Sequence, residues 1–261
     1  MAPILENKFH AAPSVFSAAA LLREARRQKA LVPVDVPDVC ILDPDGDILR
    51  HLRNSGRAER FAEWPCYHTD LHTFQLGEQR VGILARVVGA PFAVLIAEEL
   101  FACGCRFLLS VTSAGQIVDA GRPPYFVVID RALRDEGTSY HYAAGAEFAQ
   151  ADPRLVELAM RALGDAGLSV KVGASWTTDA PFRETIEAIE AARRKGILGV
   201  EMEAAALYTF AKARHASVLC LAHVTNTMAQ AEGDFEKGES DGTVEALRYL
   251  GAIVSAIRAA L

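Results

Sequence analysis

The sequence has no long uninterrupted hydrophobic run, which argues against a membrane-spanning helix. An apolar stretch at residues 87–97 stops at Glu98 and Glu99, whereas a transmembrane helix needs roughly 18 consecutive apolar residues or more. An excess of positive charge is also missing, because the formal net charge is −6 and the pI is about 5.7. Since nucleic-acid binders concentrate Lys and Arg, we expect neither a membrane nor a nucleic acid as partner.

Disulfide and zinc-finger patterns are absent as well. The five cysteines are odd in number, and the Cys103-Gly-Cys105 pair lacks both zinc-finger and redox-motif spacing. The basic cluster at residues 23–29 follows an apolar segment, the reverse of the order in a secretory signal. These features predict reduced, buried thiols, no metal site and a cytoplasmic protein.

Linkers, internal repeats and low-complexity blocks are missing too, and β-rich runs alternate with helical periods along the chain. The best-marked helix starts at Asp152-Pro153, a capping residue followed by proline at the first helical position, and ends before Gly167. A second helix, from Gly242 onward, closes the chain. The sequence therefore predicts a single α/β domain over residues 1–261, with a central mixed, twisted sheet flanked by helices.

Ligands of such sheets bind at the carboxyl ends of the strands. Six predicted loops fall at those ends and are expected to line one cleft: residues 43–47, 86–91, 112–115, 176–182, 201–203 and 225–228.

Two carboxylates, Glu201 and Glu203, lie where a short apolar strand turns into the alanine-rich helix near Phe210. Burying an unpaired carboxylate costs several kcal/mol or more, so both need partners. One interpretation is structural: one glutamate is a charge at the helix N-terminus, which the helix dipole stabilises by about 0.3–1 kcal/mol, and the other is a surface residue. The other interpretation is a ligand site, and the two interpretations stay open at this point.

The stretch 199–206, Gly-Val-Glu-Met-Glu-Ala-Ala-Ala, resembles the ribose-binding signature of the nucleoside phosphorylase superfamily. Residues 136–142, residues 176–185 and the Phe9-His10 pair match in the same order, closest to uridine-phosphorylase-like members. This resemblance spans nearly the whole chain and implies a phosphorylase/hydrolase-like fold. It also implies cleavage of the N-glycosidic bond of a uridine or purine nucleoside by phosphorolysis, giving free base and pentose 1-phosphate. Inorganic phosphate would be a co-substrate with no other cofactor, and a homodimer or hexamer would share active sites.

The resemblance further implies that the carboxylate of Glu203 accepts hydrogen bonds from the ribose 2′- and 3′-hydroxyls, while Met202 packs against the sugar. It implies that His10 reaches the 5′-hydroxyl in a neighbouring subunit. Phe182 and Arg183 would face the base, although an exposed Arg183 paired with Glu184 on a helix surface is an open alternative. The predicted substrate-binding residues are Glu201, Met202, Glu203, His10, His141, Phe182, Arg183 and Thr112.

The predicted catalytic residues are Asn226, Thr112 and Arg86. Asn226 stands where purine-specific members of the family carry an aspartate and uridine phosphorylases an arginine. An amide can donate and accept hydrogen bonds at a base edge, but it is not a strong general acid. Thr112 keeps the family's threonine in the phosphate loop.

The phosphate site departs from the family pattern. Ile48 and Leu109 replace two of its arginines, Pro44 replaces a glycine, and three aspartates crowd residues 43–47. Arg86 with His68 or His72 could rebuild a smaller anion site. Two other readings stay open: a nucleosidase that uses water, with Asp43, Asp45, Asp47 or Glu201 as base, and a non-catalytic nucleoside-binding sensor.

Overall fold

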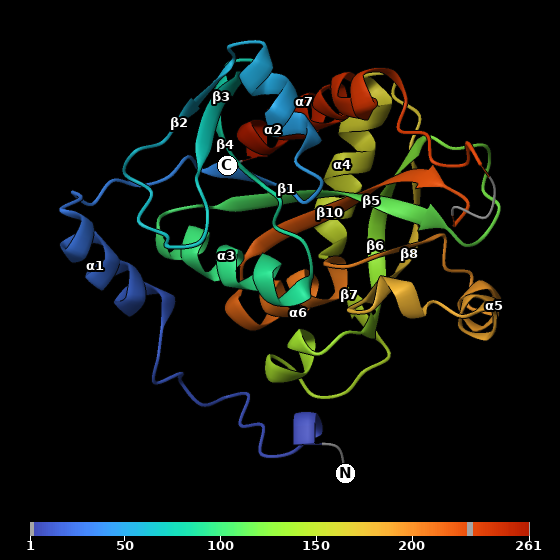
Figure 1. Cartoon of the computed structure of the whole chain (residues 1–261), viewed down its shortest axis with the longest axis horizontal. Coiled ribbons are helices and arrows are strands. Elements are labelled where there is room, and N and C mark those ends of the chain that lie inside the picture. The colour runs from blue at the N-terminus through green and yellow to red at the C-terminus, as the bar shows by residue number, and fades with distance from the viewer. Residues whose placement is uncertain (1–2, 229–231, 261) are drawn as a thin grey trace.

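Helices cover both faces of one mixed sheet in the structure, a computed structural model that describes residues 3–228 and 232–260 (Figure 1). The described strands are β1 (Val39–Asp43), β2 (Ala58–Arg60), β3 (His72–Leu76), β4 (Gln79–Ala85), β5 (Phe107–Gln116), β6 (Tyr125–Asp135), β7 (Phe148–Gln150), β8 (Lys171–Thr178), β9 (Gly199–Glu201) and β10 (Ser217–Asn226). The described α-helices are α1 (Ala18–Lys29), α2 (Asp47–Asn54), α3 (Ala90–Ala102), α4 (Pro153–Asp165), α5 (Ile186–Arg194), α6 (Ala204–Arg214) and α7 (Thr243–Ala260). Short 3-10 helices are η1 (Pro3–Leu5), η2 (Thr138–His141), η3 (Pro181–Arg183) and η4 (Glu239–Gly242).

Strand β5 is the centre of the sheet. The strand order is β10-β6-β8-β9-β5-β1-β4-β3-β2, β7 pairs with β6, and β5 also pairs with β10. The pairings of β5, β9, β8, β6 and β10 therefore close into a ring, from which β1 to β4 extend as an open wing. β5 runs parallel to β1 and β10, so the carboxyl ends of these three strands meet at one edge, where ligand sites of α/β sheets lie.

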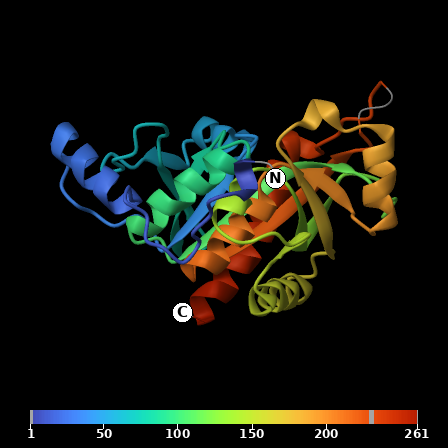
Figure 2. The ribbon, with the colours of Figure 1, turned by 90° about the horizontal axis from the view of Figure 1, so that it is seen from below.

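Two apolar cores lie on the two faces of the sheet. Helices α1, α3 and α6 contribute to one core and α2, α4 and α7 to the other, and both helical layers are visible in Figure 2. Residues 204–211 of α6 are all buried, as expected for a helix that is apolar on every side. No helix in the described ranges is long and apolar enough to span a bilayer.

Several sequence predictions are confirmed. The fold is α/β with a mixed sheet, and Asp152 caps α4 by accepting a hydrogen bond from the Arg154 N–H at 2.9 Å. Gly167, just beyond that helix, has a φ of 68°, a conformation that favours glycine at a helix C-terminus. All five cysteines are buried and unbridged.

Some predicted boundaries are wrong. Residues 112–115 are not a loop but the last part of β5, because β10 and β9 pair with them on both sides. Residues 176–178 likewise belong to β8, which pairs there with β6 and β9. Residues 181–194 form two separate elements, η3 and α5, since Thr185 caps a new helix by accepting a hydrogen bond from the Ala188 N–H. The sequence did not predict β2, β3 or β7.

Candidate active site

Glu201 ends β9, and its carboxylate is fully engaged inside the protein. It accepts hydrogen bonds from the hydroxyls of Ser175 at 2.9 Å and Thr177 at 2.5 Å, both on β8. It also accepts from the backbone N–H groups of Glu203 and Ala204, each at 2.7 Å. These N–H groups begin α6 and would otherwise lack partners. Glu201 therefore ties β8 and β9 to the start of α6, and its site role is structural in this geometry.

Glu203, two residues later, is buried but only half satisfied. Its Oε1 accepts a hydrogen bond from the Gly89 N–H at 2.7 Å, whereas its buried Oε2 has no hydrogen-bond partner among the described residues. Burial and the nearby charge of Glu201 raise the pKa of Glu203 to about 8, and the Thr112 hydroxyl beside it offsets part of the rise. Because buried polar atoms are nearly always hydrogen-bonded, the free oxygen indicates a place for a ligand that donates.

Contacts join all six predicted segments at this edge of the sheet. Each contact links residues far apart in the sequence: Glu203 to Gly89, Glu201 to Thr177, Glu203 to Thr112, Asp45 to Ser113, and Asn226 to Gly115 by strand pairing. The six segments therefore meet around Glu203, and their lining of a single cleft stays a prediction.

The turn after β1 carries a buried acid, Asp43. Its carboxylate accepts hydrogen bonds from the N–H groups of Gly46 at 3.1 Å and Leu49 at 2.9 Å. Burial, and secondarily the charges of Asp45 and Asp47, raise the pKa of Asp43 to about 7. A carboxyl group with such a pKa can accept and release a proton near neutral pH.

The other two acids of this turn are ion-paired. The Lys237 ammonium lies 2.8 Å from a carboxylate oxygen of Asp45 and 2.6 Å from one of Asp47, and Asp47 also pairs with Arg50 at 2.6 Å. Ile48 and Leu109, which the resemblance predicts to stand in place of two arginines, are buried in the apolar core. Among the described residues, the turn thus presents three carboxylates to an incoming phosphate, and the cations that contact Asp45 and Asp47 are already paired with them.

A small cavity of about 20 Å³ lies between this turn and the end of β5, which is room for roughly one water molecule. His223 on β10 lines it, with a buried Nε2 that has no hydrogen-bond partner among the described residues. The ring stacks on Phe126 at a centroid distance of 4.5 Å. Burial lowers the pKa of His223 to about 4, so the imidazole is neutral at pH 7 and can either donate or accept at Nε2.

Gly242 supports the His223 ring, and replacing it by Ala should be strongly destabilising. Its φ is 72°, and a Cβ would lie 2.3 Å from His223 Cε1 and 2.5 Å from the Lys237 carbonyl oxygen. We expect Gly242→Ala to lower the free energy of unfolding by about 2–4 kcal/mol in urea denaturation. Gly56→Ala is the matched control, because Gly56 has a φ of 66° with nothing within 4 Å, and strain alone costs about 1 kcal/mol. If Gly242→Ala and Gly56→Ala lowered the free energy of unfolding equally, the packing role of Gly242 would be contradicted.

Asn226 ends β10 with its amide engaged in a turn. Its Oδ1 accepts from the Met228 N–H at 2.9 Å, and its Nδ2 donates to the Thr225 hydroxyl at 3.1 Å. A Cβ on Gly115 would lie 2.7 Å from Met228 Sδ, so the Met228 side chain would have to move to admit one. One Nδ2 hydrogen of Asn226 is left for a ligand.

The predicted site residues His10 and His141 lie where the N-terminal segment contacts η2. His10 Nε2 is 3.1 Å from the Tyr140 carbonyl oxygen, and His141 Nδ1 is 3.2 Å from Lys8 Nζ, so the N-terminal segment rests on η2. Phe182 on η3 is 98% exposed and Arg183 is exposed beside it. Met202 is partly exposed between the two glutamates.

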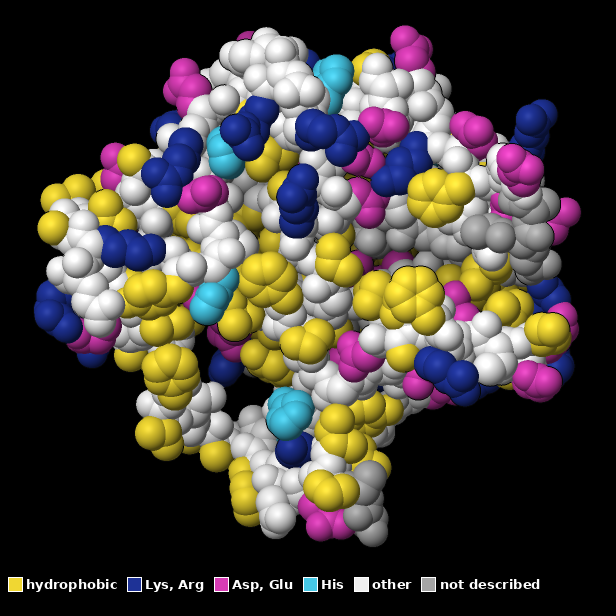
Figure 3. All heavy atoms as spheres, viewed as in Figure 1, with side chains coloured by type: hydrophobic (Ala, Val, Ile, Leu, Met, Phe, Trp, Pro, Cys, Tyr) yellow, Lys and Arg dark blue, Asp and Glu magenta, His cyan; other side chains and the backbone are white. Residues whose placement is uncertain are grey.

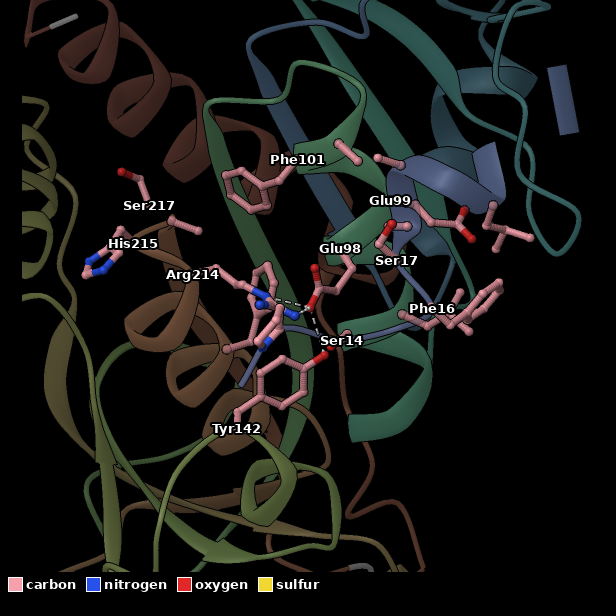
Figure 4. Close-up of a pocket in the computed structure, with 18 of the residues that line it drawn as sticks. Ser14, Phe16, Ser17, Glu98, Glu99, Phe101, Tyr142, Arg214, His215 and Ser217 are labelled. Atoms are coloured by element: carbon pink, nitrogen blue, oxygen red, sulfur yellow. Dashed lines mark hydrogen bonds and ion pairs between the residues drawn. The ribbon is translucent and has the colours of Figure 1, made fainter. Parts of the chain in front are cut away.

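A separate cavity of about 930 Å³ lies between the N-terminal segment, α3 and α6, and none of the predicted site residues lines it. In Figure 4, Glu98, Tyr142 and Arg214 point toward one another in its wall. The Glu98 carboxylate accepts from the Tyr142 hydroxyl at 3.0 Å and from Arg214 Nε at 2.9 Å. The size of this cavity alone does not make it the active site, because these polar groups in its wall already hydrogen-bond one another.

Comparison with known proteins decides the family. The model of the phosphorylase superfamily matches residues 38–257. The chain belongs to this superfamily. One phosphorylase superfamily relative, the DeoD-type purine nucleoside phosphorylase of Clostridium novyi (strain NT), is 27% identical over 188 residues, covering 69% of this chain and 81% of the relative.

Two solved structures from the phosphorylase superfamily share the fold. Uridine phosphorylase from Vibrio fischeri ES114 has a TM-score of 0.70 at 22% identity, with 88% of this chain and 94% of that chain covered. Purine nucleoside phosphorylase from Toxoplasma gondii, in complex with immucillin-H, has a TM-score of 0.73 at 16% identity, with the same coverage. The predicted fold and family are therefore confirmed.

Several residues of the candidate site escaped the sequence-based prediction. Gly89, which holds Glu203, was predicted only as part of a turn. Lys237 and His223 were not singled out, although a lone His on an apolar strand and a Lys in an acidic segment are visible in the sequence. The residues that Lys237 and His223 contact are far from them along the chain, so no local sequence pattern identifies either residue as part of the site.

Proposed function

We propose that the protein cleaves the N-glycosidic bond of a nucleoside at the site around Glu203. The observation that carries this proposal is the half-satisfied carboxylate, with Oε1 held by the Gly89 N–H at 2.7 Å and Oε2 buried without a partner. A sugar 2′,3′-diol supplies the two hydroxyl donors that such a carboxylate accepts. Membership of the phosphorylase superfamily supports the same reaction class.

The chemistry explains why a buried carboxylate suits this role. Breaking a glycosidic bond places positive charge on the sugar ring, and a fixed negative group nearby stabilises that charge more in the transition state than in the substrate. Charge-assisted hydrogen bonds to the diol contribute about 1.5–3 kcal/mol each and hold the ring in place. The free Nδ2 hydrogen of Asn226 and the side chains of Phe182 and Arg183 are our candidates for contact with the base.

For the nucleophile, the charge of the turn after β1 favours water over phosphate. A phosphate dianion there would meet Asp43, Asp45 and Asp47, and the cavity lined by Thr112 and His223 measures only about 20 Å³. A single water fits this volume. Asp43, with a pKa of about 7, is our candidate for the general base, so we favour the nucleosidase form of the reaction over phosphorolysis.

The test is incubation with a panel of pyrimidine and purine nucleosides, with and without inorganic phosphate, followed by chromatography of the products. We expect free base and free pentose at a rate that does not depend on phosphate. Pentose 1-phosphate formed only with phosphate would overturn the hydrolytic assignment. Nucleoside binding without any base release would overturn cleavage itself and favour a sensor.

Nucleoside affinity should rise with pH up to about 8. In the empty site the pKa of Glu203 is about 8, so below that pH the carboxyl group is mostly neutral and accepts hydrogen bonds poorly. Binding to the ionised form then weakens about tenfold for each pH unit below 8 and levels off above it. Isothermal titration between pH 6 and 9 measures this profile, and Glu203→Gln should flatten it. A wild-type profile that is flat through this range would refute the carboxylate's role.

A further inference from the structure

The described part of the segment between β10 and α7 folds back over the turn after β1. Lys237 in this segment lies 2.8 Å from a carboxylate oxygen of Asp45 and 2.6 Å from one of Asp47. Asp241, in the same segment, pairs with Arg50 of α2 at 2.6 Å. On the face shown in Figure 3, Asp or Glu side chains lie among Lys or Arg side chains over α2 and the start of α7. Ion pairs therefore hold the segment against the turn and α2.

The backbone of this segment is shaped for the same contact. Ser240, Asp241 and Gly242 have φ values of 52°, 58° and 72°, a left-handed conformation that glycine adopts far more readily than other residues. A Cβ on Gly242 would lie 2.5 Å from the carbonyl oxygen of Lys237. Such a turn persists only where surrounding contacts hold it, so the fold fixes the position of the Lys237 ammonium.

The buried carboxyl group of Asp43 lies within the field of these charges. After burial itself, the negative charges of Asp45 and Asp47 contribute to the raised pKa of Asp43. Burial lowers the pKa of Lys237, but its contacts with Asp45 and Asp47 outweigh burial and raise this pKa. The ammonium therefore stays charged while Asp43 titrates. The other charged or titratable groups around the turn are Arg50 of α2, Arg86 of the loop before α3, His223 of β10 and Asp241 of η4.

The two acids depend on Lys237 to different degrees. Asp47 also pairs with Arg50, whereas Lys237 is the cation that pairs with Asp45 among the described residues. Without the ammonium, Asp45 would keep the hydrogen bond from the Ser113 hydroxyl, which does not cancel its charge. An uncancelled negative charge beside a buried carboxyl group disfavours ionisation of that group.

We propose that Lys237 is a positioning residue for the reaction: its ammonium neutralises Asp45 and Asp47 and so lets the buried carboxyl group of Asp43 ionise and act as base. This inference rests on the proposed function. In that reaction the attacking water gives one proton to the Asp43 carboxylate, its oxygen bonds to the sugar carbon, and the departing base takes the electron pair of the broken bond. Lys237 acts through the neighbouring acids and not on the reacting atoms.

The pH dependence of kcat tests this role. Saturating nucleoside keeps the titration of Glu203 in the empty site out of the profile, because kcat reports groups of the bound complex. In wild type, kcat should rise with pH around a midpoint of about 7, the pKa of Asp43. Lys237→Met removes the charge and should move the midpoint up by about one pH unit. At pH 7, kcat then falls about fivefold, whereas at pH 9 it changes little. Lys237→Arg should restore the wild-type profile.

Carbon-13 NMR of the Asp43 carboxyl group, assigned with Asp43→Asn, follows the same proton without turnover. The midpoint of this titration should also move up by about one pH unit in Lys237→Met. If the protein releases no base, the NMR titration still decides whether Lys237 controls the proton on Asp43. Failure of the proposed function and failure of this inference are therefore separate outcomes.

Lys195→Met is the matched control, because it removes the same charge from an exposed lysine that pairs with Glu147, away from the turn. It should leave both midpoints at the wild-type value. Thermal melts of all variants establish that they are folded. The inference is overturned if Lys237→Met leaves both midpoints unmoved, if it lowers kcat equally at every pH, or if Lys195→Met moves the midpoints as far.

Discussion

Glu203→Gln should lower kcat/KM for nucleoside cleavage by about 100- to 10,000-fold, from the loss of two charge-assisted contacts of about 1.5–3 kcal/mol each. Glutamine keeps the size of the side chain and an oxygen for the Gly89 N–H, but it loses the negative charge that the developing sugar cation needs. Stability should stay the same or rise, because burial and Glu201 make a charge on Glu203 costly. Steady-state kinetics and thermal unfolding measure the two effects on the same samples.

Glu98→Gln is the control for this experiment. Glu98 is also a glutamate in a polar cluster, paired with Tyr142 and Arg214, but it lies on α3 in the wall of the separate 930 Å³ cavity. Its replacement should leave kcat/KM within about twofold of wild type, since it contacts neither sugar nor base in our proposal. Near-normal activity of Glu203→Gln, or a loss of activity that only follows unfolding, would refute the ribose assignment.

Glu201→Ala should instead lower the free energy of unfolding by about 3–5 kcal/mol, a value typical of breaking a buried charged network. The substitution leaves the hydroxyls of Ser175 and Thr177 and two N–H groups of α6 without their acceptor. At about 2–4 °C per kcal/mol, the midpoint of thermal unfolding should fall by about 6–20 °C.

Urea denaturation checks this value directly. Glu157→Ala on α4, an exposed glutamate whose only ion pair is a 3.6 Å contact with Arg161 among the described residues, is the control and should change stability by less than about 0.5 kcal/mol. A loss for Glu201→Ala as small as that of the control would contradict the anchoring role.

The two glutamates therefore have different tasks although they are two residues apart. Glu201 still belongs to β9 and its carboxylate meets the hydroxyls of β8 and the first N–H groups of α6. Glu203 stands at the start of α6, and Gly89 satisfies only one of its oxygens. Glu201 matches the helix N-terminal charge of the structural interpretation, whereas the surface residue that this interpretation placed beside it is wrong, because both glutamates are buried. The ligand position at Glu203 stays a prediction.

Much of the fold could be predicted because its signals are local. The cap at Asp152, the glycine after α4 and the helical spacing of α7 each depend on residues within a few turns of one another. The rule that ligands lie at strand ends also selected the six segments that meet around Glu203. Predictions failed where strand pairing formed in a segment whose residues are typical of a loop. Residues 112–115 are such a segment, and they extend β5 between two partner strands.

The phosphate side of the site could not be predicted to the same depth. The resemblance predicts that Ile48 and Leu109 replace arginines, and the sequence shows that acids crowd residues 43–47. It did not indicate that Lys237, 192 residues from Asp45, pairs with those acids, nor that His223 lines a cavity with them. Residues that pair with a distant segment need only be close to it in space, so the sequence of that segment does not identify them.

The sequence by itself determined the α/β class and the family, because each follows from residues that are adjacent or periodic along the chain. Only the tertiary structure decided which carboxylate is satisfied and which is left with a free oxygen. That distinction depends on donors from β8 and from the loop before α3, 24 to 114 residues away. Hydrogen-bond partners are set by folded distances of about 3 Å, and the fold, not the local sequence, brings those groups together.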